Sequence, residues 1–314
     1  MTKMATREAY GRALAEFGSD ERMVVLDADL SKSTNTATFR SAYPERHVNM
    51  GIAEGNMMSV AAGMATCGKI AFASTFAIFA AERALEQIRN SACYPNLNVK
   101  VCATHAGLTV GEDGASHQCI EDLSIMRALP NMHVISPCDA ASTRAAIRVA
   151  MDTNGPFYIR LGRLPVEGVY GEYGDEISFT LGKANVLREG RDVTIIATGT
   201  MVNIALAACD QLATEGIHAR VLDMHTIKPI DEEAIILASK ETGAVVTAEE
   251  HTILGGLGGA VAEVLSEKAP CILRRVGVMD TFGQSGKPEA LLTLYRLTAE
   301  HIAEAARDAI ARKS

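Results

Sequence analysis

The sequence lacks the features that mark several classes of protein. No apolar stretch reaches eighteen residues, so no segment is predicted to span a bilayer. The N-terminal stretch MTKMATREAYGRALAEF is amphipathic and charged throughout, which is unlike a signal peptide. There is no block of basic residues, and 30 Lys and Arg against 38 Asp and Glu give a net charge of −8. We therefore expect neither general nucleic-acid binding nor association with a membrane.

The cysteine pattern predicts no cross-links. Seven cysteines occur, and none forms a C-x-x-C pair, so neither a disulfide framework nor a structural zinc site is predicted. We expect reduced thiols in a cytoplasmic protein, several of them packed as small hydrophobic side chains.

What the chain does have is the composition of a folded protein and an alternating pattern of elements. Of its 314 residues, 48% are hydrophobic and 22% are charged. The length of the chain suits two domains. Short apolar runs rich in β-branched residues alternate with amphipathic stretches, which predicts βαβ repetition and a doubly wound parallel sheet. In the first half we predict strands at 23–26, 70–73, 99–103, 133–136 and 157–161, and helices at 5–17, 54–67, 81–93, 119–129 and 139–152.

A second βα series follows a break in the pattern. Residues 165–190 hold five glycines and show no helical period, which predicts a linker. The fold class is therefore α/β, with two doubly wound domains and mainly parallel sheets. Thr298 is the predicted N-cap of the last helix. In the second half we predict strands at 193–197, 219–222, 244–247 and 272–277, and helices at 201–215, 231–240, 257–267 and 298–312.

The polar residues of the first half gather after the predicted strands. Ligands of open parallel sheets bind beyond the carboxyl ends of the strands. The densest segment is 105–118, here called the histidine loop, with His105 and His117, two acids and three glycines. Glycines allow close approach of backbone to a ligand, and histidines exchange protons near neutral pH. The alternative is a polar loop whose histidines only hydrogen-bond the backbone.

Other candidate residues also have a simpler structural interpretation. Glu54 is the first residue of an Ala- and Met-rich helix. An acid there could simply complement the helix dipole, or, if it is buried, it could hold a proton for a ligand nitrogen. Phe76 and Phe79 lie three residues apart and could be core residues or a stacking surface for a flat ring. Together, four dispersed polar residues would suit a phosphate ester: Arg7, Lys32, Ser33 and Arg163.

These segments together resemble the C-terminal half of transketolases, the thiamine-diphosphate enzymes that move two-carbon ketol units between sugars. The resemblance covers nearly the whole chain, as a pyrimidine-binding domain at 5–170 and a transketolase C-terminal domain at 186–314. Six motifs in order carry it: VVLDADLSKST, ERHVNMGIAEGNM, FASTFAIFA, ATHAGLTVGEDGASHQ, YIRLGR and EEHTILGGLGGAVAE.

The resemblance implies a role for each matching residue. Glu54 matches the glutamate that bonds N1′ of the cofactor's aminopyrimidine and so activates the thiazolium. Phe76 and Phe79 match the rings that stack on and flank the pyrimidine, and Asp29 matches an acid near the cofactor and a subunit contact. His117 and Asp113 match the residues that face the donor's hydroxyls. The groups that grip the substrate phosphate match Arg7, Ser33, His105 and Arg163.

Two positions depart from the family pattern, and one motif is missing. Glu82 stands where some relatives have a tyrosine, and Gly55 where close relatives often have glutamine. No G-D-G occurs, although transketolases bind the diphosphate and its metal through that motif and a later asparagine. We therefore assign no metal ligand in this chain. We expect Mg²⁺ and the diphosphate on an N-terminal partner subunit, an α₂β₂ assembly and sugar phosphates as substrates.

Three other functions remain open from the residues. The β subunit of a 2-oxoacid dehydrogenase has similar length and domain order, but its histidine loop differs from GEDGASHQ. A 1-deoxyxylulose-5-phosphate synthase-like chain usually lacks a histidine matching His105. A non-catalytic relative with the same fold would have no reason to keep Glu54, Asp113 and His117 together.

Overall fold

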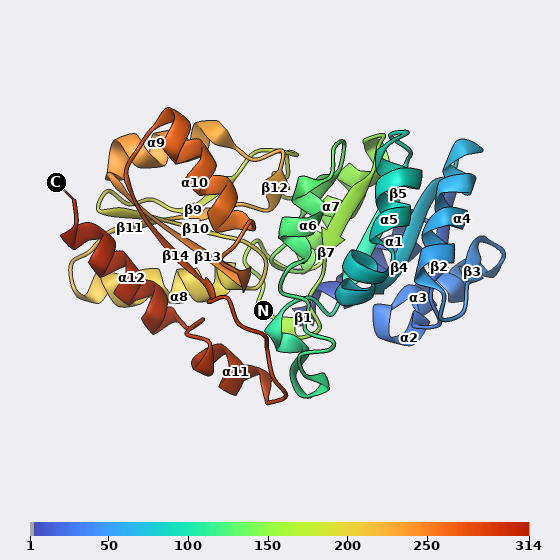
Figure 1. Cartoon of the computed structure of the whole chain (residues 1–314), viewed down its shortest axis with the longest axis horizontal. Helices are drawn as coiled ribbons and strands as arrows, with labels where there is room; N and C mark the ends of the chain where they lie inside the picture. The colour runs from blue at the N-terminus through green and yellow to red at the C-terminus, as the bar shows by residue number, and fades with distance from the viewer. Residues whose placement is uncertain (1–2, 314) are drawn as a thin grey trace.

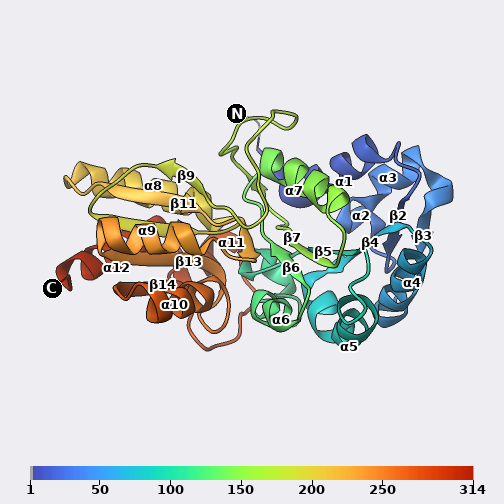
Figure 2. The same cartoon turned by 90° about the horizontal axis from the view of Figure 1, so that it is seen from above.

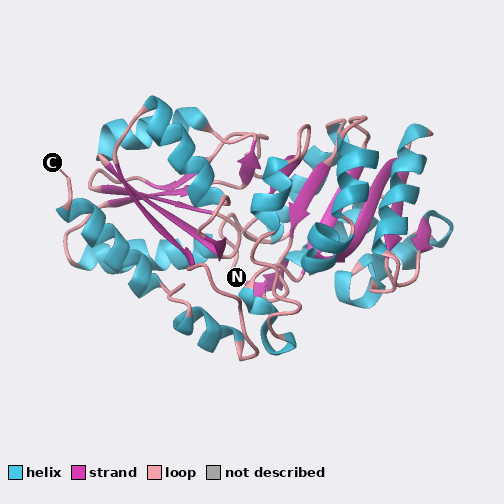
Figure 3. Ribbon diagram, in the orientation of Figure 1, coloured by secondary structure: helices cyan, strands magenta, loops and turns pink. Residues whose placement is uncertain are grey.

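The computed structural model describes residues 3–313 and places two α/β domains side by side (Figure 1). The last residue predicted for the second domain, Ser314, lies outside the described part. Both domains have a mainly parallel sheet covered by helices on its two faces, as predicted. Figure 3 shows the two sheets as separate sets of strands, with helices packed against each.

The first sheet has seven strands in the order β12-β6-β7-β5-β4-β2-β3. All pairs are parallel except that of the edge strand β12, which runs antiparallel to β6. The central strands are buried throughout, as expected for parallel strands covered on both faces. The strands are β2 (Met23–Asp27), β3 (His47–Asn49), β4 (Ile70–Phe76), β5 (Val99–Thr104), β6 (His133–Ile135), β7 (Phe157–Arg160) and β12 (Thr226–Lys228).

Helices cover both faces of this sheet, with α1, α3 and α7 on one side and α4, α5 and α6 on the other (Figure 2). The start of α7 is fixed by Asp139, whose carboxylate accepts a hydrogen bond from Ser142 N at 2.8 Å in a capping box. The helices are α1 (Thr6–Phe17), α2 (Ser31–Thr34), α3 (Thr36–Ala42), α4 (Glu54–Thr66), α5 (Leu85–Gln87), α6 (Asp122–Ala128) and α7 (Ala140–Asp152), with 3₁₀ turns at Pro44–Arg46 and Leu108–Asp113.

Two local predictions for this domain were incomplete. The helix predicted at 81–93 is broken into π-helical turns at Phe79–Arg83 and Ile88–Cys93 around the short α5. A periodicity argument assumes 3.6 residues per turn and cannot detect such wider turns, which often occur at functional sites. The short elements β3, α2 and α3 were also not predicted.

The second domain has a five-stranded sheet in the order β14-β13-β10-β11-β9. In Figure 1, α9 and α10 lie on one side of this sheet and α8 and α12 on the other. Asp231 caps α9 by accepting a hydrogen bond from Ala234 N. The elements are β9 (Asn185–Arg188), β10 (Val193–Ala197), α8 (Met201–Thr214), β11 (Ala219–Asp223), α9 (Glu232–Thr242), β13 (Ala244–Thr252), α10 (Leu257–Lys268), β14 (Ile272–Val278), α11 (Pro288–Leu294) and α12 (Ala299–Ala311).

The segment predicted as a linker, 165–190, is partly structured at both ends. Its first residues form β8 (Pro165–Val166), which pairs antiparallel with β1 (Met4–Ala5). Its last residues form β9, which pairs antiparallel with β11. Thr298 does precede α12, but its hydroxyl lies 2.7 Å from Nδ1 of His301 and makes no capping bond to a backbone amide.

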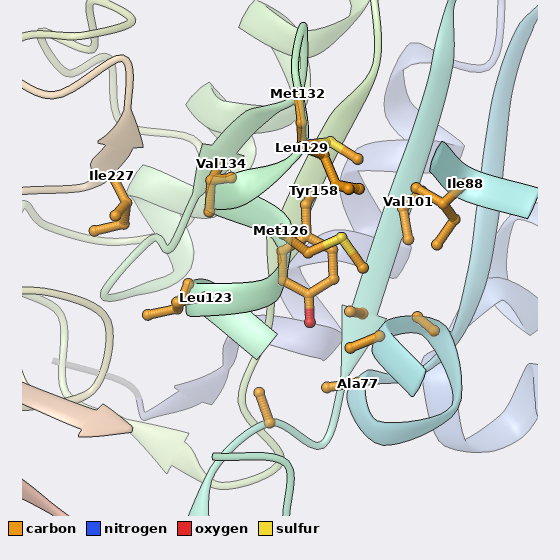
Figure 4. Close-up of a cluster of buried hydrophobic side chains, with 14 of the residues drawn as sticks. Ala77, Ile88, Val101, Leu123, Met126, Leu129, Met132, Val134, Tyr158 and Ile227 are labelled. Atoms are coloured by element: carbon orange, nitrogen blue, oxygen red, sulfur yellow. The ribbon is translucent and has the colours of Figure 1, made fainter. Parts of the chain in front are cut away.

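One hydrophobic core continues from the first domain into the second. Figure 4 shows Tyr158 and Met126 packed together in the first domain, with Val134 and Ile227 nearby, where β12 joins the edge of the sheet. Because β12 follows β11 in the chain but pairs with β6, the second domain supplies an edge strand to the first sheet. Among residues 3–313, no helix is long and apolar enough to cross a membrane.

Candidate active site

The predicted site residues follow the carboxyl ends of four neighbouring strands of the first sheet. These strands are β7, β5, β4 and β2, which are adjacent in the strand order. Arg163 follows β7, His105 follows β5, Phe76 ends β4, and Asp29 follows β2. Positions spread over more than 130 residues of sequence therefore lie along one edge of the sheet, where ligands of such folds bind.

Four aromatic rings form the centre of this edge. The ring of Phe76 stacks on that of His105, with centroids 3.9 Å apart, and on that of Phe79 at 5.7 Å. His117 meets Phe79 edge-on at 5.6 Å. The structure therefore places both histidines of the histidine loop against the phenylalanine pair. His105 has a backbone φ of 57°, a left-handed conformation that is uncommon outside glycine and that turns the chain sharply after β5.

Glu54 is the first residue of α4 and is only 5% exposed. Its Oε1 lies 3.2 Å from Nη1 of Arg83, whose guanidinium also sits 4.1 Å from the centroid of the Phe79 ring. Arg83 thus links the carboxylate to the aromatic group, although the sequence analysis did not select it. Its side chain is 56% exposed, so this ion pair can separate without burying an unpaired cation.

The residues predicted to grip a phosphate form a connected group. Nε of Arg7 donates to the carbonyl of Arg163 at 3.2 Å, and its Nη1 donates to the carbonyl of Ser33 at 2.7 Å. Arg163 donates to the carbonyl of Val110 and lies 3.8 Å from Oδ2 of Asp113. Ser33 contributes its backbone carbonyl here, and Lys32 is exposed. Both guanidinium groups are therefore fixed by backbone carbonyls at the edge of the sheet, and their charges act on each other.

Charge repulsion and burial both act on this group. His105 is 4% exposed, and its pKa is lowered to about 3 by burial and by the charges of Arg7 and Arg163, with a further contribution from His117. The pKa of Arg7 is lowered by burial and by the neighbouring charge of Arg163. Asp113 offsets part of the positive charge of Arg163, and a bound anion would further reduce the repulsion between Arg7 and Arg163.

Asp29 is the predicted residue that lies apart from these contacts. It is exposed, has a φ of 62°, and accepts a hydrogen bond from Nδ2 of Asn49 at 2.8 Å. The buried acid of this turn is instead Asp27, whose Oδ2 lies 2.7 Å from Nε2 of His47. Burial alone would raise the pKa of Asp27, but the hydrogen bonds of His47, Thr36 and the Leu30 amide hold it below its usual range. Asp27 therefore organises the turn that carries Asp29 and Ser33.

The two departures from the family pattern have local explanations. A Cβ at position 55 would lie 3.0 Å from Oε1 of Gln87, so a longer side chain there requires only a flexible neighbour to move. Glu82 lies with Cys119 and Glu121 in a group whose ligand-type atoms are all within 4.8 Å of one another. Burial and the charge of Glu121 raise the pKa of Glu82. The position is therefore occupied by an acid that faces another acid, Glu121, and the thiol of Cys119.

Comparison with known proteins supports the family assignment from the motifs. Residues 2–167 match the model of the transketolase pyrimidine-binding domain, and residues 182–302 match that of the transketolase C-terminal domain. A Methanocaldococcus jannaschii chain named for a transketolase C-terminal section is 53% identical over 95% of this chain and 94% of its own length. The 6-deoxy-6-sulfo-D-fructose transketolase subunit SqwH of a Clostridium species is 47% identical over 98% of this chain and 95% of its own.

A solved structure gives the same result for the fold. The β₄ tetramer of a split-gene transketolase, described as inactive, matches with a TM-score of 0.93 and 57% identity, over 99% of this chain and all of that one. The resemblance inferred from the motifs is confirmed, and these matches do not favour a dehydrogenase or a 1-deoxyxylulose-5-phosphate synthase. The chain belongs to the transketolase family, whose pyrimidine-binding and C-terminal domains it carries.

Proposed function

We propose that this chain is the C-terminal subunit of a heteromeric transketolase, a transferase that moves a two-carbon ketol unit from a ketose phosphate to an aldose phosphate. The observation that carries the proposal is the cationic group around Arg7 and Arg163. Arg7 bonds both the carbonyl of Arg163 and that of Ser33, while both arginines lower the pKa of the buried His105. A pair of guanidiniums held beside a neutral imidazole is suited to a phosphate group, which accepts hydrogen bonds from all three.

The family implies thiamine diphosphate as the cofactor, and the residues of this chain fit its pyrimidine half. Glu54 offers a carboxyl group shielded from water, and Phe76 and Phe79 offer stacked rings within 5.7 Å of each other. Bound thiamine diphosphate supplies a carbanion-stabilising centre that no side chain provides. In this proposal Glu54 shares a proton with a pyrimidine nitrogen, and Phe76 and Phe79 hold the ring and exclude water.

Two residues of the histidine loop are assigned to the sugar. We assign His117 to the reacting hydroxyls of the donor, because its ring packs edge-on against Phe79 at the centre of the site. We assign Asp113 to the hydroxyl next to the donor carbonyl, because its carboxylate lies 3.8 Å from the phosphate-binding Arg163. His105, kept neutral, accepts or donates a hydrogen bond at the phosphate. Proton transfer by positioned groups of this kind contributes about 10²- to 10⁴-fold.

The rest of the site is assigned to a partner. We propose that Mg²⁺ and the diphosphate are bound by an N-terminal transketolase subunit in an α₂β₂ assembly, with Asp29 near the subunit contact. Exposure of Asp29 and the absence of G-D-G from the sequence support this arrangement. We take 5–170 and 186–314 as the two domains of this chain. All seven cysteines are free, in keeping with the reducing cytoplasm expected from the sequence.

Reconstitution tests the proposal. The chain alone, with thiamine diphosphate, Mg²⁺ and a ketose phosphate, should show no turnover. Addition of a partner chain of about 270–300 residues with the G-D-G motif should give ketol transfer, and both chains should elute together at the mass of an α₂β₂ complex. Robust turnover by the isolated chain, or turnover of pyruvate in preference to ketose phosphate, would contradict the proposal.

The substrate class can be tested by varying the anionic group at the end of the donor sugar. The relative SqwH is named for a sulfonated sugar, and a Phocaeicola vulgatus subunit that is 38% identical over 96% of this chain and 96% of its own length is named for apulose 4-phosphate. Phosphate and sulfonate both accept hydrogen bonds from guanidinium groups. A comparison of kcat/KM for donors that differ only in this group identifies the substrate class.

A further inference from the structure

One buried carboxylate of the second domain contacts the histidine loop of the first domain. Glu250 lies in β13 and is 2% exposed. Its Oε1 accepts a hydrogen bond from the backbone amide of Thr109 at 2.6 Å, and its Oε2 accepts one from the hydroxyl of Thr200 at 2.9 Å. The two oxygens therefore connect the loop of the first domain to the start of α8 in the second.

The backbone of the loop is shaped around this carboxylate. Gly107 has a φ of 82°, and a Cβ at that position would lie 2.4 Å from the carboxylate of Glu250. Glycine is therefore required both by the left-handed conformation and by the close approach. The contact is built into the loop two residues after His105, at the point where the chain leaves β5.

An arginine of the first domain, Arg160, lies beside Glu250 but is ion-paired with Asp122. Nη2 of Arg160 donates to the carbonyl of Glu250 at 2.9 Å, and its Nε donates to Asp122 at 2.8 Å. Burial raises the pKa of Glu250, whereas Arg160 and the bond from the Thr109 amide act in the opposite direction. A carboxylate in this position is costly unless its donors stay in place, so the donors and the loop are held together.

Other contacts of the second domain hold the far end of the loop without using a buried charge. The amide nitrogen of Gln118 donates to the carbonyl of Gln284 at 2.9 Å, and the hydroxyl of Ser285 donates to the carbonyl of Glu112 at 2.7 Å. α11 packs beside the 3₁₀ turn Leu108–Asp113, as Figure 1 also shows. The second domain therefore contacts the loop at several points besides Glu250.

We propose that Glu250 is a positioning residue that fixes the histidine loop through the backbone amide of Thr109. Thr109 lies between His105 and Asp113, so a shift of its amide moves both ends of the segment that is assigned to the substrate. The catalytic part of this inference rests on the proposed function, whereas the anchoring of the loop does not. The second domain thereby has a direct part in shaping a site whose reacting groups belong to the first.

The anchoring is tested on the isolated chain by hydrogen–deuterium exchange of peptides that contain Thr109. Glu250→Ala removes both bonds and should speed exchange at this amide by roughly tenfold or more, as expected for a lost bond to a charged acceptor. Glu250→Gln should behave close to the unmodified chain, because the amide oxygen can accept from Thr109 and the amide nitrogen can donate to Thr200. Unchanged exchange in Glu250→Ala would overturn the proposal.

The matched control is the neighbouring residue of the same strand. Glu249 is also buried, but it accepts hydrogen bonds from the amides of Leu257 and Gly258 at 2.7 Å and so caps α10 within its own domain. Glu249→Ala should lower the melting temperature yet leave exchange at Thr109 unchanged. If Glu249→Ala speeds exchange in the loop as much as Glu250→Ala, the effect is general destabilisation and the proposal is wrong.

The positioning role is tested on the reconstituted enzyme. Glu250→Ala should lower kcat by roughly 10- to 100-fold, because small displacements of positioned groups have effects of this size, with KM for the ketose phosphate changed less than threefold. Glu250→Gln should restore most of kcat, and Glu249→Ala should leave kcat unchanged. Faster exchange in Glu250→Ala with normal kcat would refute positioning. If no partner gives transketolase activity at all, the proposed function fails while the exchange experiment still decides the anchoring.

Discussion

The carboxyl ends of the strands carry acidic side chains in both domains, but these side chains have different partners. In the first domain Glu54 is paired with Arg83, a side chain more than half exposed and free to move away. In the second domain Glu249 is bonded to two backbone amides at the start of α10. One acid is held by a partner that can be displaced, and the other by groups fixed in the fold.

The two edges also differ in how their other polar groups are paired. Arg7 and Arg163 repel each other and lower the pKa of His105, and Asp113 lies 3.8 Å from Arg163, so a bound anion would further reduce the repulsion at the first edge. At the second edge Asp223 accepts a hydrogen bond from the hydroxyl of Tyr170 at 2.7 Å and one from the thiol of Cys138 at 3.5 Å. A polar cluster beyond parallel strands therefore indicates a ligand site where the fold leaves like charges acting on one another, as Arg7 and Arg163 do.

Glu54→Gln gives the largest expected effect on this comparison. Activity of the reconstituted enzyme should fall by at least about 10²- to 10⁴-fold, because glutamine cannot hand a proton to the cofactor. Stability should change by at most about 1 kcal/mol, because the ion pair that is removed involves an exposed arginine. Steady-state kinetics and urea unfolding of the same preparations measure both quantities.

Glu249→Gln is the counterpart of that variant in the second domain. It keeps one acceptor for two backbone amides, so the free energy of unfolding should fall by about 1–3 kcal/mol while kcat stays near its original value. Normal activity of Glu54→Gln, or loss of activity in Glu249→Gln at temperatures where it is folded, would remove the distinction between the two edges.

Asp223→Asn tests the second edge through pH. Burial raises the pKa of Asp223 to about 7, although Tyr170 and Cys138 act to lower it. The folded chain therefore binds a proton that the unfolded chain has already lost between about pH 4 and pH 7. The free energy of unfolding should fall as pH rises through this window, by about 4 kcal/mol at most. Urea unfolding at several pH values should show this slope in the unmodified chain and a flatter profile in Asp223→Asn, and equal slopes would contradict the assignment.

Arg163→Ala tests the anion site of the first edge. KM for a phosphorylated ketose should rise by roughly 10- to 100-fold, the range expected for a lost charge-assisted hydrogen bond, and KM for a short unphosphorylated donor should change little. Arg148→Ala is the control, because Arg148 is exposed and its partners, Asp152 one turn along α7 and the ring of Phe17, are not among the predicted site residues. Equal changes of KM for both donors would show that Arg163 does not bind the phosphate.

The sequence was sufficient for most of the architecture and for the composition of the site. Buried parallel strands can be recognised in the sequence as short apolar runs. Accordingly, β10 and β13 begin at the predicted residues. The motifs named Phe76, His105 and His117, and the structure brings their rings together. Period and motif are local properties, so these predictions needed no knowledge of how distant segments pack.

Apart from the π-helical turns and the short elements of the first domain, the missed features depend on contacts between distant segments. β12 joins the sheet of the first domain across the domain boundary, and no pattern within its three residues indicates that partner. Arg83 and Glu250 are ordinary charged residues in the sequence, and they matter because Glu54 and Thr109 lie beside them. The low pKa of His105 could not be predicted from the sequence for the same reason. It depends on Arg7 and Arg163, which lie at opposite ends of the first domain in the sequence.

The titration of His105 is the smallest effect and the most direct check of that environment. With a pKa of about 3, its imidazole stays neutral at all pH values where the enzyme would work, whereas an exposed histidine titrates near pH 6.5. Because the folded-state pKa is lower than the unfolded one, this residue costs stability as pH falls from about 6.5 towards 3. In NMR of the isolated chain, the imidazole signal that is assigned to His105 by its loss in His105→Gln should not titrate above about pH 5. In Arg163→Ala its pKa should move back towards the usual range, because one of the repelling charges is gone. A titration near pH 6.5 in the unmodified chain would mean that His105 is not buried among cations, and the anion site would lose its main support.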